Sequence, residues 1–364
     1  MAPGEASSFD SLEQKYGHFN APEADVLIEG QLARQSDMAI DWVDVELSTD
    51  AQADVARFSI SNGYIWSESR MQWIGSTITV GKKLQVKLGY ADKKSLVFDG
   101  IITGYTLDYP SNGSPAIIVT AMDRSFLMMK TSHSKVWNQK KDSDVVRQIA
   151  GEYGLSAEID DTTVTKKTIE QIGISDYHFI RSLAIENDRL FYVDGTKLYF
   201  KKPKTSGSPL ITLKYGKNLV QFTLQVDGSS QTSKVTVRGY DVDKVEAIEY
   251  SASTVTVIGS NQKSGPSVAS LLSTKKIEVV YTQAASQEEA QSLGKAMLER
   301  LSRELAAGNG TSVGLPEIKP GELIKLEGLG STSLDQLMRL RKVIHKLDAT
   351  DGYMTYFETE GNAI

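Results

Sequence analysis

The sequence predicts a mainly β protein with α+β portions, in which two β-barrel domains flank a small α+β domain. Short runs that alternate apolar and polar residues recur from Asp25 to Asp123 and again after residue 206, which is the period of half-buried strands. The stretch between them combines helical spacing with a hairpin signal. The later β region also repeats a pattern of the earlier one, and the two copies are Gly81, Leu84, Val86, Gly89 and Gly321, Ile324, Leu326, Gly328.

This repeated pattern predicts two related β-barrels in one chain. Leu84 and Val86 stand two residues apart, as do Ile324 and Leu326, so each pair would point to one buried face of a strand. In both copies a glycine precedes the strand, and two further strand-like runs follow.

Length and composition limit the function classes. A chain of 364 residues is long enough for two or three domains. Hydrophobic residues at 40% and charged residues at 24% are typical of a globular protein without a membrane span. The net charge of −6 comes without a basic block, which argues against specific nucleic-acid binding. The absence of cysteine excludes disulfides and thiolate chemistry.

Residues 1–24 are polar and aperiodic, and they predict an N-terminal extension that orders on a partner, if at all. They contain neither a cationic leader nor an apolar run. We therefore expect a protein that is made in the cytoplasm and reaches the outside only through lysis or within a larger particle.

Residues 25–126 are expected to form the first barrel. After its strand-like run "ARFSISN" comes the loop-like segment "NGYIWSESRMQWIG", which carries Tyr64, Trp66 and Trp73 among polar neighbours. Aromatic side chains in such loops are common interface anchors. Packing of the loop on its own barrel is an equally weighted alternative.

Residues 127–205 are expected to form the α+β domain. The run "SDVVRQIAGEYGL" has helical spacing, with Gly154 placed to end the helix. Ser175 is a fitting N-cap for a second helix that stops near Asn187. The runs "RLFYV" and "KLYFK" flank Asp194-Gly195, a strong signal for a two-residue β-hairpin.

Residues 206–364 are expected to form the second barrel, with an inserted segment over 242–283 and a helix over 286–307. Ser286 and Glu289 have capping-box spacing, and Gly308 would end the helix. One apolar stripe runs along this helix, and its residues are Ala290, Leu293, Met297, Leu301 and Leu305.

No pattern indicates a catalytic, cofactor-binding or metal site. The run "GNGTSVG" from Gly308 lacks the third glycine of a dinucleotide-binding loop and follows a helix, so a helix end and turn explain it better. The pairs Asp160-Asp161 and Glu288-Glu289 fit a solvated surface better than a glycosidase site, which needs two carboxyls across a cleft. The histidines lie far apart without metal-ligand spacing: His18, His133, His178 and His345.

Several segments stand in a characteristic order: "VFDGIITGYTLDYPSNGSPAIIVTAMDRSFLMMK", "SDVVRQIAGEYGL", "SDYHFIRSLAIENDRLFYVDGTKLYF", "SKVTVRGYD", "EIKPGELIKLEGLG" and "GYMTYFETE". From Asp25 to Glu360 this series resembles the late control D family, the baseplate hub proteins of contractile phage tails and related injection particles, including the hub portion of type VI secretion spikes. The sequence departs from the family in residues 1–24 and in "STSLDQLMRLRKV", which replaces a strand approach richer in glycine and tyrosine. No spike β-helix or lysozyme domain is fused, so those are expected as separate chains.

The resemblance implies a non-enzymatic hub with two barrels like those of tail tube proteins. Three subunits would form a ring of six barrels, which adapts a hexameric tail tube to a trimeric spike, with residues 127–205 facing the spike. The implied partners are further copies of the chain, the tail tube protein, the trimeric spike protein and other baseplate proteins, with a tape measure protein or cargo as an open option. The expected location is the baseplate of a virion tail or of an extracellular contractile particle.

Two alternatives stay open. A tail-associated cell-wall hydrolase or carbohydrate-binding module is suggested by the small α+β domain and the loop aromatics. An effector-loading hub of a bacterial injection particle would share the fold and differ in cargo. The residues do not separate a phage from a bacteriocin or an injection machine.

Overall fold

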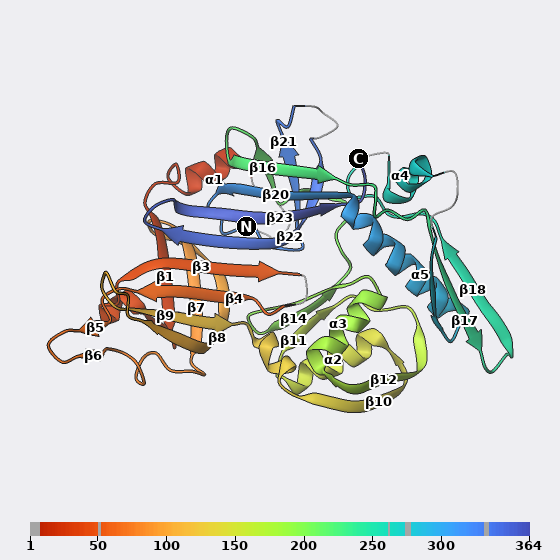
Figure 1. Ribbon diagram of the computed structural model, residues 1–364, viewed down its shortest axis with the longest axis horizontal. Coiled ribbons are helices and arrows are strands. Elements are labelled where there is room, and N and C mark those ends of the chain that lie inside the picture. Colours follow the sequence, from red (N-terminus) through yellow and green to blue (C-terminus); the bar gives the residue numbers. More distant parts are fainter. Residues whose placement is uncertain (1–7, 50–51, 261–262, 274–277, 331–334) are drawn as a thin grey trace.

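The computed structural model describes residues 8–49, 52–260, 263–273, 278–330 and 335–364. The chain is mainly β, with one sheet of 13 strands that runs through both predicted β regions and four smaller sheets of two or three strands. In Figure 1 the strands of the large sheet lie side by side, the α+β unit lies below them, and a third unit around the long helix α5 lies at one end.

The N-terminal part of the chain, up to the end of the first β region, contributes the following elements: α1 (Phe9–Lys15), β1 (Pro22–Ile28), β2 (Gln31–Leu32), η1 (Ala33–Ser36), β3 (Ile40–Ser48), β4 (Val55–Ile60), β5 (Tyr64–Ile65), β6 (Arg70–Met71), β7 (Lys83–Tyr90), β8 (Lys93–Asp108) and β9 (Ala116–Met122). The α+β unit contributes η2 (Arg124–Met129), β10 (Ser132–Lys141), α2 (Asp142–Glu152), β11 (Ser156–Ile159), β12 (Thr165–Ser175), α3 (Asp176–Glu186), β13 (Leu190–Asp194) and β14 (Lys197–Lys201).

The remainder contributes β15 (Ile211–Lys214), β16 (Leu219–Val226), β17 (Lys234–Asp241), β18 (Glu246–Ala252), α4 (Gly265–Leu272), β19 (Glu278–Ala284), α5 (Gln287–Ser302), η3 (Arg303–Leu305), β20 (Ala306–Val313), β21 (Leu323–Glu327), β22 (Leu337–Asp348) and β23 (Gly352–Gly361). The large sheet has the order β16-β20-β23-β22-β3-β4-β9-β8-β7-β1-β2, and β21 and β15 branch from β22.

The strand order of the large sheet corrects the prediction of two separate barrels. Among the described strands the order is open at both ends, and the two β regions share one sheet. The reason is an antiparallel seam between β3 and β22, in which Val43 to Ser48 pair with Lys342 to Leu347. One apolar core therefore serves both regions, and it includes Val45, Phe58 and Leu340.

The two β regions nevertheless repeat one strand arrangement. Unit A is β3, β4, β9, β8 and β7, and unit B is β16, β20, β23, β22 and β21, each paired in that order. Both units bend their fourth strand at a bulge, between Ile102 and Gly104 in β8 and between Leu340 and Lys342 in β22. The arrangements differ at one strand, because β1 joins β7 antiparallel whereas β15 joins β21 parallel.

Backbone hydrogen bonds at the start of β7 and of β21 make the repeat explicit. A glycine with positive φ donates its N–H to the carbonyl of the residue before the bulge, and that residue donates back to the residue after the glycine. The bonds are Gly81 to Ile102 (2.8 Å), Ile102 to Lys82 (2.8 Å), Gly321 to Leu340 (2.7 Å) and Leu340 to Glu322 (2.8 Å).

The α+β unit follows the local sequence signals. Ser175 caps α3 by accepting from the His178 N–H, and Gly154 follows α2 with φ +66°. The hairpin of β13 and β14 turns at Gly195 and Thr196, since Asp194 still pairs with Lys197. These elements enclose a separate core around Trp137, Ile180 and Phe200.

The predicted helix over 286–307 ends earlier than expected. The helix α5 stops at Ser302, and Gly308 lies inside β20, not at a helix end. Glycine is required there and at Gly310 because a Cβ at either position would collide with the ring of Phe222 or Phe357. Parts of the predicted inserted segment, residues 261–262 and 274–277, lie outside the described residues, as do residues 331–334 of "STSLDQLMRLRKV".

The N-terminal extension also differs from the prediction. Residues 1–7 lie outside the described residues, but α1 and the turn after it dock on the protein's own core. Leu12 and Tyr16 are buried, and the Tyr16 hydroxyl and the Lys15 ammonium both contact Oε1 of Glu317, at 2.6 Å and 2.7 Å.

Candidate assembly surface

Besides the outer sides of the short strands β2 and β15, two edges of the large sheet have no strand partner among the described residues. In β8 only residues 93–102 have a partner on the side away from β9, which leaves the backbone of Thr103 to Asp108 open. At one end of the sheet order, β16 pairs with β20 on one side and with no described strand on the other. An open edge exposes a row of N–H and C=O groups, which is a template for adding another strand.

Both open edges carry exposed apolar side chains. Tyr109, directly after β8, is 57% exposed, and Tyr105 within it is also exposed. On β16, Val226 is 46% exposed and Val220 is exposed as well. Large apolar side chains grouped along unpaired edges are typical of surfaces that another protein covers.

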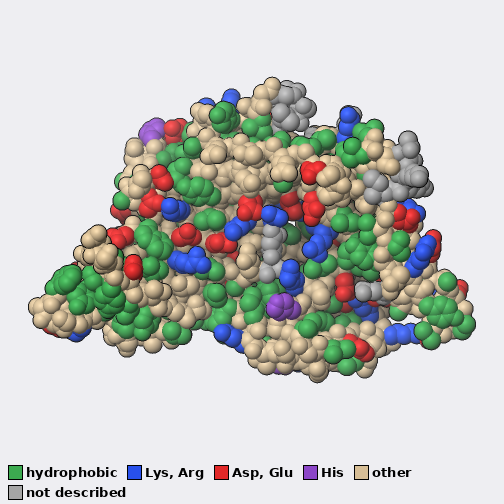
Figure 2. Space-filling view, in the orientation of Figure 1, with side chains coloured by type: hydrophobic (Ala, Val, Ile, Leu, Met, Phe, Trp, Pro, Cys, Tyr) green, Lys and Arg blue, Asp and Glu red, His purple; other side chains and the backbone are tan. Residues whose placement is uncertain are grey.

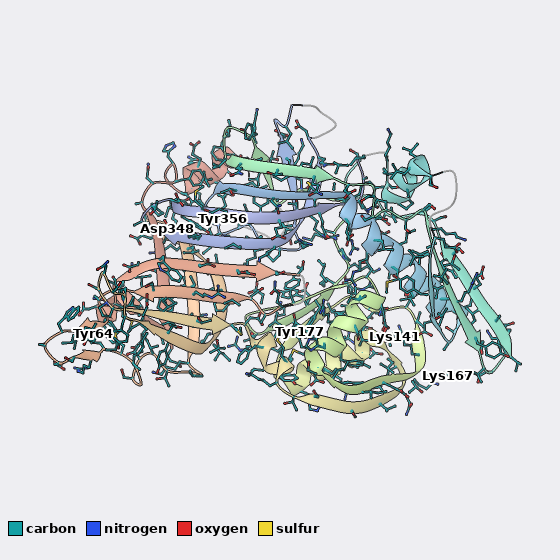
Figure 3. The ribbon with its side chains drawn as sticks, in the orientation of Figure 1. Tyr64, Lys141, Lys167, Tyr177, Asp348 and Tyr356 are labelled. Atoms are coloured by element: carbon teal, nitrogen blue, oxygen red, sulfur yellow. The ribbon has the colours of Figure 1, made fainter. Side chains whose placement is uncertain are left out.

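The seam between β3 and β22 shows how such an edge looks when it is covered. Val43, Val45 and Val343 are fully buried there. On the other face of the sheet, Lys342 forms an ion pair of 2.7 Å with Glu46. The same face carries Tyr356 of β23 and Asp348 at the end of β22 (Figure 3).

A long excursion between β4 and β7, residues 61–80, forms an arm at one end of the molecule. It contains β5 and β6, and Figure 2 shows hydrophobic side chains gathered over this end. Tyr64 meets the edge of Trp66 at 4.9 Å between ring centroids and that of Tyr109 at 6.0 Å. The arm thereby lies next to the open edge of β8, with Tyr64 labelled in Figure 3.

The structure separates the three aromatic residues that the sequence proposed as interface anchors. Trp66 is 69% exposed and Tyr64 half-buried beneath it, as anchors for a partner would be. Trp73 instead packs against the core of unit A, in a left-handed backbone conformation at φ +62°. The alternative of packing on the chain's own core therefore holds for Trp73.

The residues of the repeated sequence pattern lie at matching positions in units A and B, except for the last glycine of each copy. Leu84 and Val86 of β7 and Ile324 and Leu326 of β21 are all fully buried, and Leu84 pairs with Gly100 as Ile324 pairs with Met338. The last glycines do not correspond. Gly89 lies within β7, paired with Lys94, whereas Gly328 follows the end of β21 with φ +81°.

A family model described as the Alg8 N-terminal domain matches residues 20–345. The chain belongs to this family. No curated protein matches the chain. The Alg8 N-terminal domain description states no activity, so the fold and its surfaces have to carry the functional argument.

Solved structures show which proteins share this fold. The 43 kDa tail protein of prophage MuSo2 from Shewanella oneidensis is 13% identical, with a TM-score of 0.69 over 93% of this chain and 98% of that chain. A tail protein from Neisseria meningitidis MC58 is 13% identical, with a TM-score of 0.70 over 93% and 96%. The Escherichia coli c3393 protein, a component of the type VI secretion system, is 12% identical, with a TM-score of 0.56 over 93% and 77%. This member of the Alg8 N-terminal domain family thus has a fold of phage tail proteins.

The junction between unit A and the α+β unit holds two buried carboxylates. Asp123 caps η2 by accepting from the Ser125 N–H, and it also accepts from the Asp54 N–H. Burial raises the pKa of Asp123 to about 6, and burial together with the charge of Asp123 raises the pKa of Asp54 well above its ordinary value. Because these oxygens bind backbone amides and Asp123 is only 3% exposed, the pair acts as a structural joint.

A cavity of about 630 Å³ opens beside this joint, and carboxylates dominate its charged lining. Five of them form ion pairs, which are Asp194 with Lys319, Glu322 with Lys204, Asp99 with Arg124, Glu158 with Lys201 and Glu317 with Lys15. In the described part of the chain no group of three or more His, Asp or Glu residues is arranged to hold a metal ion. The cavity therefore holds no such metal-binding group among the described residues.

The residues weighed for chemistry from the sequence have local roles. Asp160 pairs with Lys201 at 3.0 Å, Asp161 with Arg147 at 3.0 Å, and Glu289 binds the Ala285 N–H at the start of α5. His345 is fully buried between Tyr353 and the Ile318 carbonyl, and this burial lowers its pKa to about 4.

The other three histidines also have local contacts. His178 bonds Ser175 at the start of α3, His133 lies 3.4 Å from Asp176, and His18 is exposed near Glu13. Within the described ranges, no helix combines the length and apolar character needed to cross a membrane.

Proposed function

We propose that this protein is the structural hub of a contractile tail or injection particle, located in the baseplate of a virion tail or of an extracellular particle. Three copies form a ring of six sheet units that joins a hexameric tail tube to a trimeric spike. The observation that carries the proposal is the arrangement of units A and B, which repeat one strand order within a continuous sheet that carries the open edges of β8 and β16.

The open edges favour a closed ring of copies. They belong to different strands, which lie seven positions apart in the sheet order, so a contact between the β8 edge of one copy and the β16 edge of another is heterologous. Heterologous contacts produce either a closed ring or an open filament. Because each chain carries two equivalent units, a ring of three chains offers a sixfold set of units to one partner and threefold symmetry to another.

The remaining parts of the chain are candidates for the two faces of the ring. In Figure 1 the arm of residues 61–80 projects at the left end of the molecule, and the α+β unit lies below its middle. We assign the arm, with Tyr64, Trp66 and the supporting Trp73, to contact with the tail tube, and the α+β unit to contact with the spike. Other baseplate proteins, and a tape measure protein or cargo, would bind around or within the ring.

The shared fold supports a structural role in a tail. Two of the solved structures are named as tail proteins, and each matches nearly its whole length to this chain.

The mass of the purified chain in solution tests the proposal. Sedimentation or light scattering should give three times the 39.9 kDa of the chain, with the trimer favoured as concentration rises. Val226→Lys on the open β16 edge should shift the protein to monomer, because a buried lysine opposes association. Val280→Lys is a matched control, since Val280 is 45% exposed on a strand of the third unit. A wild-type chain that stays monomeric at every concentration, also with spike protein present, would contradict the hub.

A further inference from the structure

We infer that β8 of one copy pairs with β16 of the next in a defined register, which copies the seam between β22 and β3 inside each chain. The inference rests on the proposed ring and deepens it by naming the residues that meet. Its central pair is Leu107 of one copy with Leu224 of the next.

The register follows from two ladders of paired residues that cross the units. In unit A, the ladder passes through Ile102, Ala121, Ala56 and Val45. In unit B, the corresponding ladder passes through Leu340, Thr359, Gly308 and Leu224. Val45 of β3 therefore corresponds to Leu224 of β16. Both β8 and β22 carry their bulge directly after the first residue of this ladder, so residues at equal distances from Ile102 and Leu340 correspond. Leu107 and His345 each lie five residues further along the strand and therefore correspond.

The seam inside the chain supplies the last step. There His345 pairs with Val45, and the strands are antiparallel. Replacing each residue by its counterpart pairs Leu107 with Leu224. The neighbouring pairs follow from the antiparallel direction, and they are Tyr105 with Val226, Thr106 with Gln225, Asp108 with Thr223 and Tyr109 with Phe222.

The exposure of side chains supports this register. Val343 and Leu47, which pair in the internal seam, are both buried. Their counterparts are Tyr105 and Val226, which are 40% and 46% exposed in the single chain. The apolar residues that the isolated copy leaves in water are thus those whose equivalents the internal seam covers. Burial of apolar side chains is the main driving force of such association.

The polar face of the two seams differs. In the internal seam the ion pair of Lys342 with Glu46 spans β22 and β3. The counterparts of these residues are Gly104 and Gln225, which cannot form an ion pair. In this register Gly104 meets Asp227, so the charged side chains on that face are Asp108 and Asp227, both acidic. The proposed seam has no ion pair for salt to screen, so association between copies should not weaken as the salt concentration rises.

Engineered cysteines test the register directly, since the natural chain contains none. The variant Thr106→Cys with Gln225→Cys and the variant Tyr105→Cys with Val226→Cys place cysteines at two successive predicted pairs. One of the two is a non-hydrogen-bonded pair with the shorter Cα separation, so at least one suits a disulfide. Within one chain the β8 and β16 edges are seven strand spacings apart along the sheet, so a disulfide must join two copies.

The control shifts the register by two residues on the same face, with Thr106→Cys and Thr223→Cys. We expect oxidised dimers and trimers, resolved by denaturing electrophoresis without reductant, for the predicted pairs and at least about tenfold less for the shifted pair. A trimer in solution whose shifted pair cross-links as well as or better than the predicted pairs overturns the register and leaves the hub intact. A protein that never associates overturns both.

Discussion

Arg339 of β22 forms an ion pair with Glu360 of β23 in the interior of the protein, where Arg339 is only 1% exposed. The neighbouring Arg303, in η3 after α5, pairs with Asp188 just after α3, so this second pair links the end of the α5 helix to the α+β unit. Removing one partner of a buried pair leaves an uncompensated charge, whereas an exposed pair contributes little.

We expect Glu360→Gln to lower the free energy of unfolding by about 3 kcal/mol, because the Arg339 guanidinium would lose its counter-ion without regaining water. The matched control is Glu358→Gln, two residues away on the same strand. Glu358 pairs with Arg341 at 2.6 Å, and both side chains are partly exposed, so its loss should cost less than about 1 kcal/mol. Equal effects in urea denaturation would show that the buried pair is not a stabilising joint.

Stability should fall as pH rises through about 6. The pKa of Asp123 is raised by burial to about 6 in the folded chain, so the folded state holds a proton that the unfolded state has lost. The contribution of this proton to the free energy of unfolding is fully present below about pH 4 and is lost as pH rises through the folded pKa of Asp123. Asp123→Asn should flatten the pH dependence of the unfolding free energy between pH 4 and 7 by about 1–3 kcal/mol. If the pH dependence of the unfolding free energy is unchanged in this variant, a group other than Asp123 holds the proton.

Gly310→Ala should destabilise the protein by about 1–3 kcal/mol, because the added methyl group would collide with the ring of Phe357 in a packed sheet. Gly104→Ala serves as the control. Gly104 also lies in a strand, but a Cβ there meets no atom within 4 Å and its backbone needs no positive φ. Thermal unfolding at one protein concentration compares the two, and a larger loss for the Gly104 variant would refute the packing account.

The arm allows stability to be separated from assembly. Trp66→Ala should leave the melting temperature unchanged, since the side chain is 69% exposed, and should weaken co-sedimentation with the tail tube partner. Trp73→Ala should instead lower the melting temperature, because its ring packs on the core of unit A. If Trp66→Ala assembles like the wild type, the arm does not contact the tube through this residue.

Local signals in the sequence predicted local structure well. Ser175 as an N-cap, Gly154 after α2 and the hairpin at Gly195 depend on neighbouring residues alone. The repeat of units A and B was also visible, through Gly81 and Gly321, because each must adopt a positive φ before its strand.

The long-range features had no such signal. The pairing of β3 with β22 joins segments almost 300 residues apart, and nothing near Val43 or Leu347 distinguishes an internal seam from an outer edge. Gly308 and Gly310 were interpreted as a helix end, because their need for space comes from Phe222 and Phe357 on other strands. The docking of α1 could have been foreseen, since Leu12 and Tyr16 stand four residues apart on one helical face.

The seam between β3 and β22 also bears on how readily a ring could be built. Every association between free molecules costs translational and rotational freedom, about 4–15 kcal/mol each. Since each chain already fuses two units through that seam, a six-unit ring needs far fewer encounters than one built from single units. The covalent backbone thus makes half of the joints of the proposed ring independent of protein concentration.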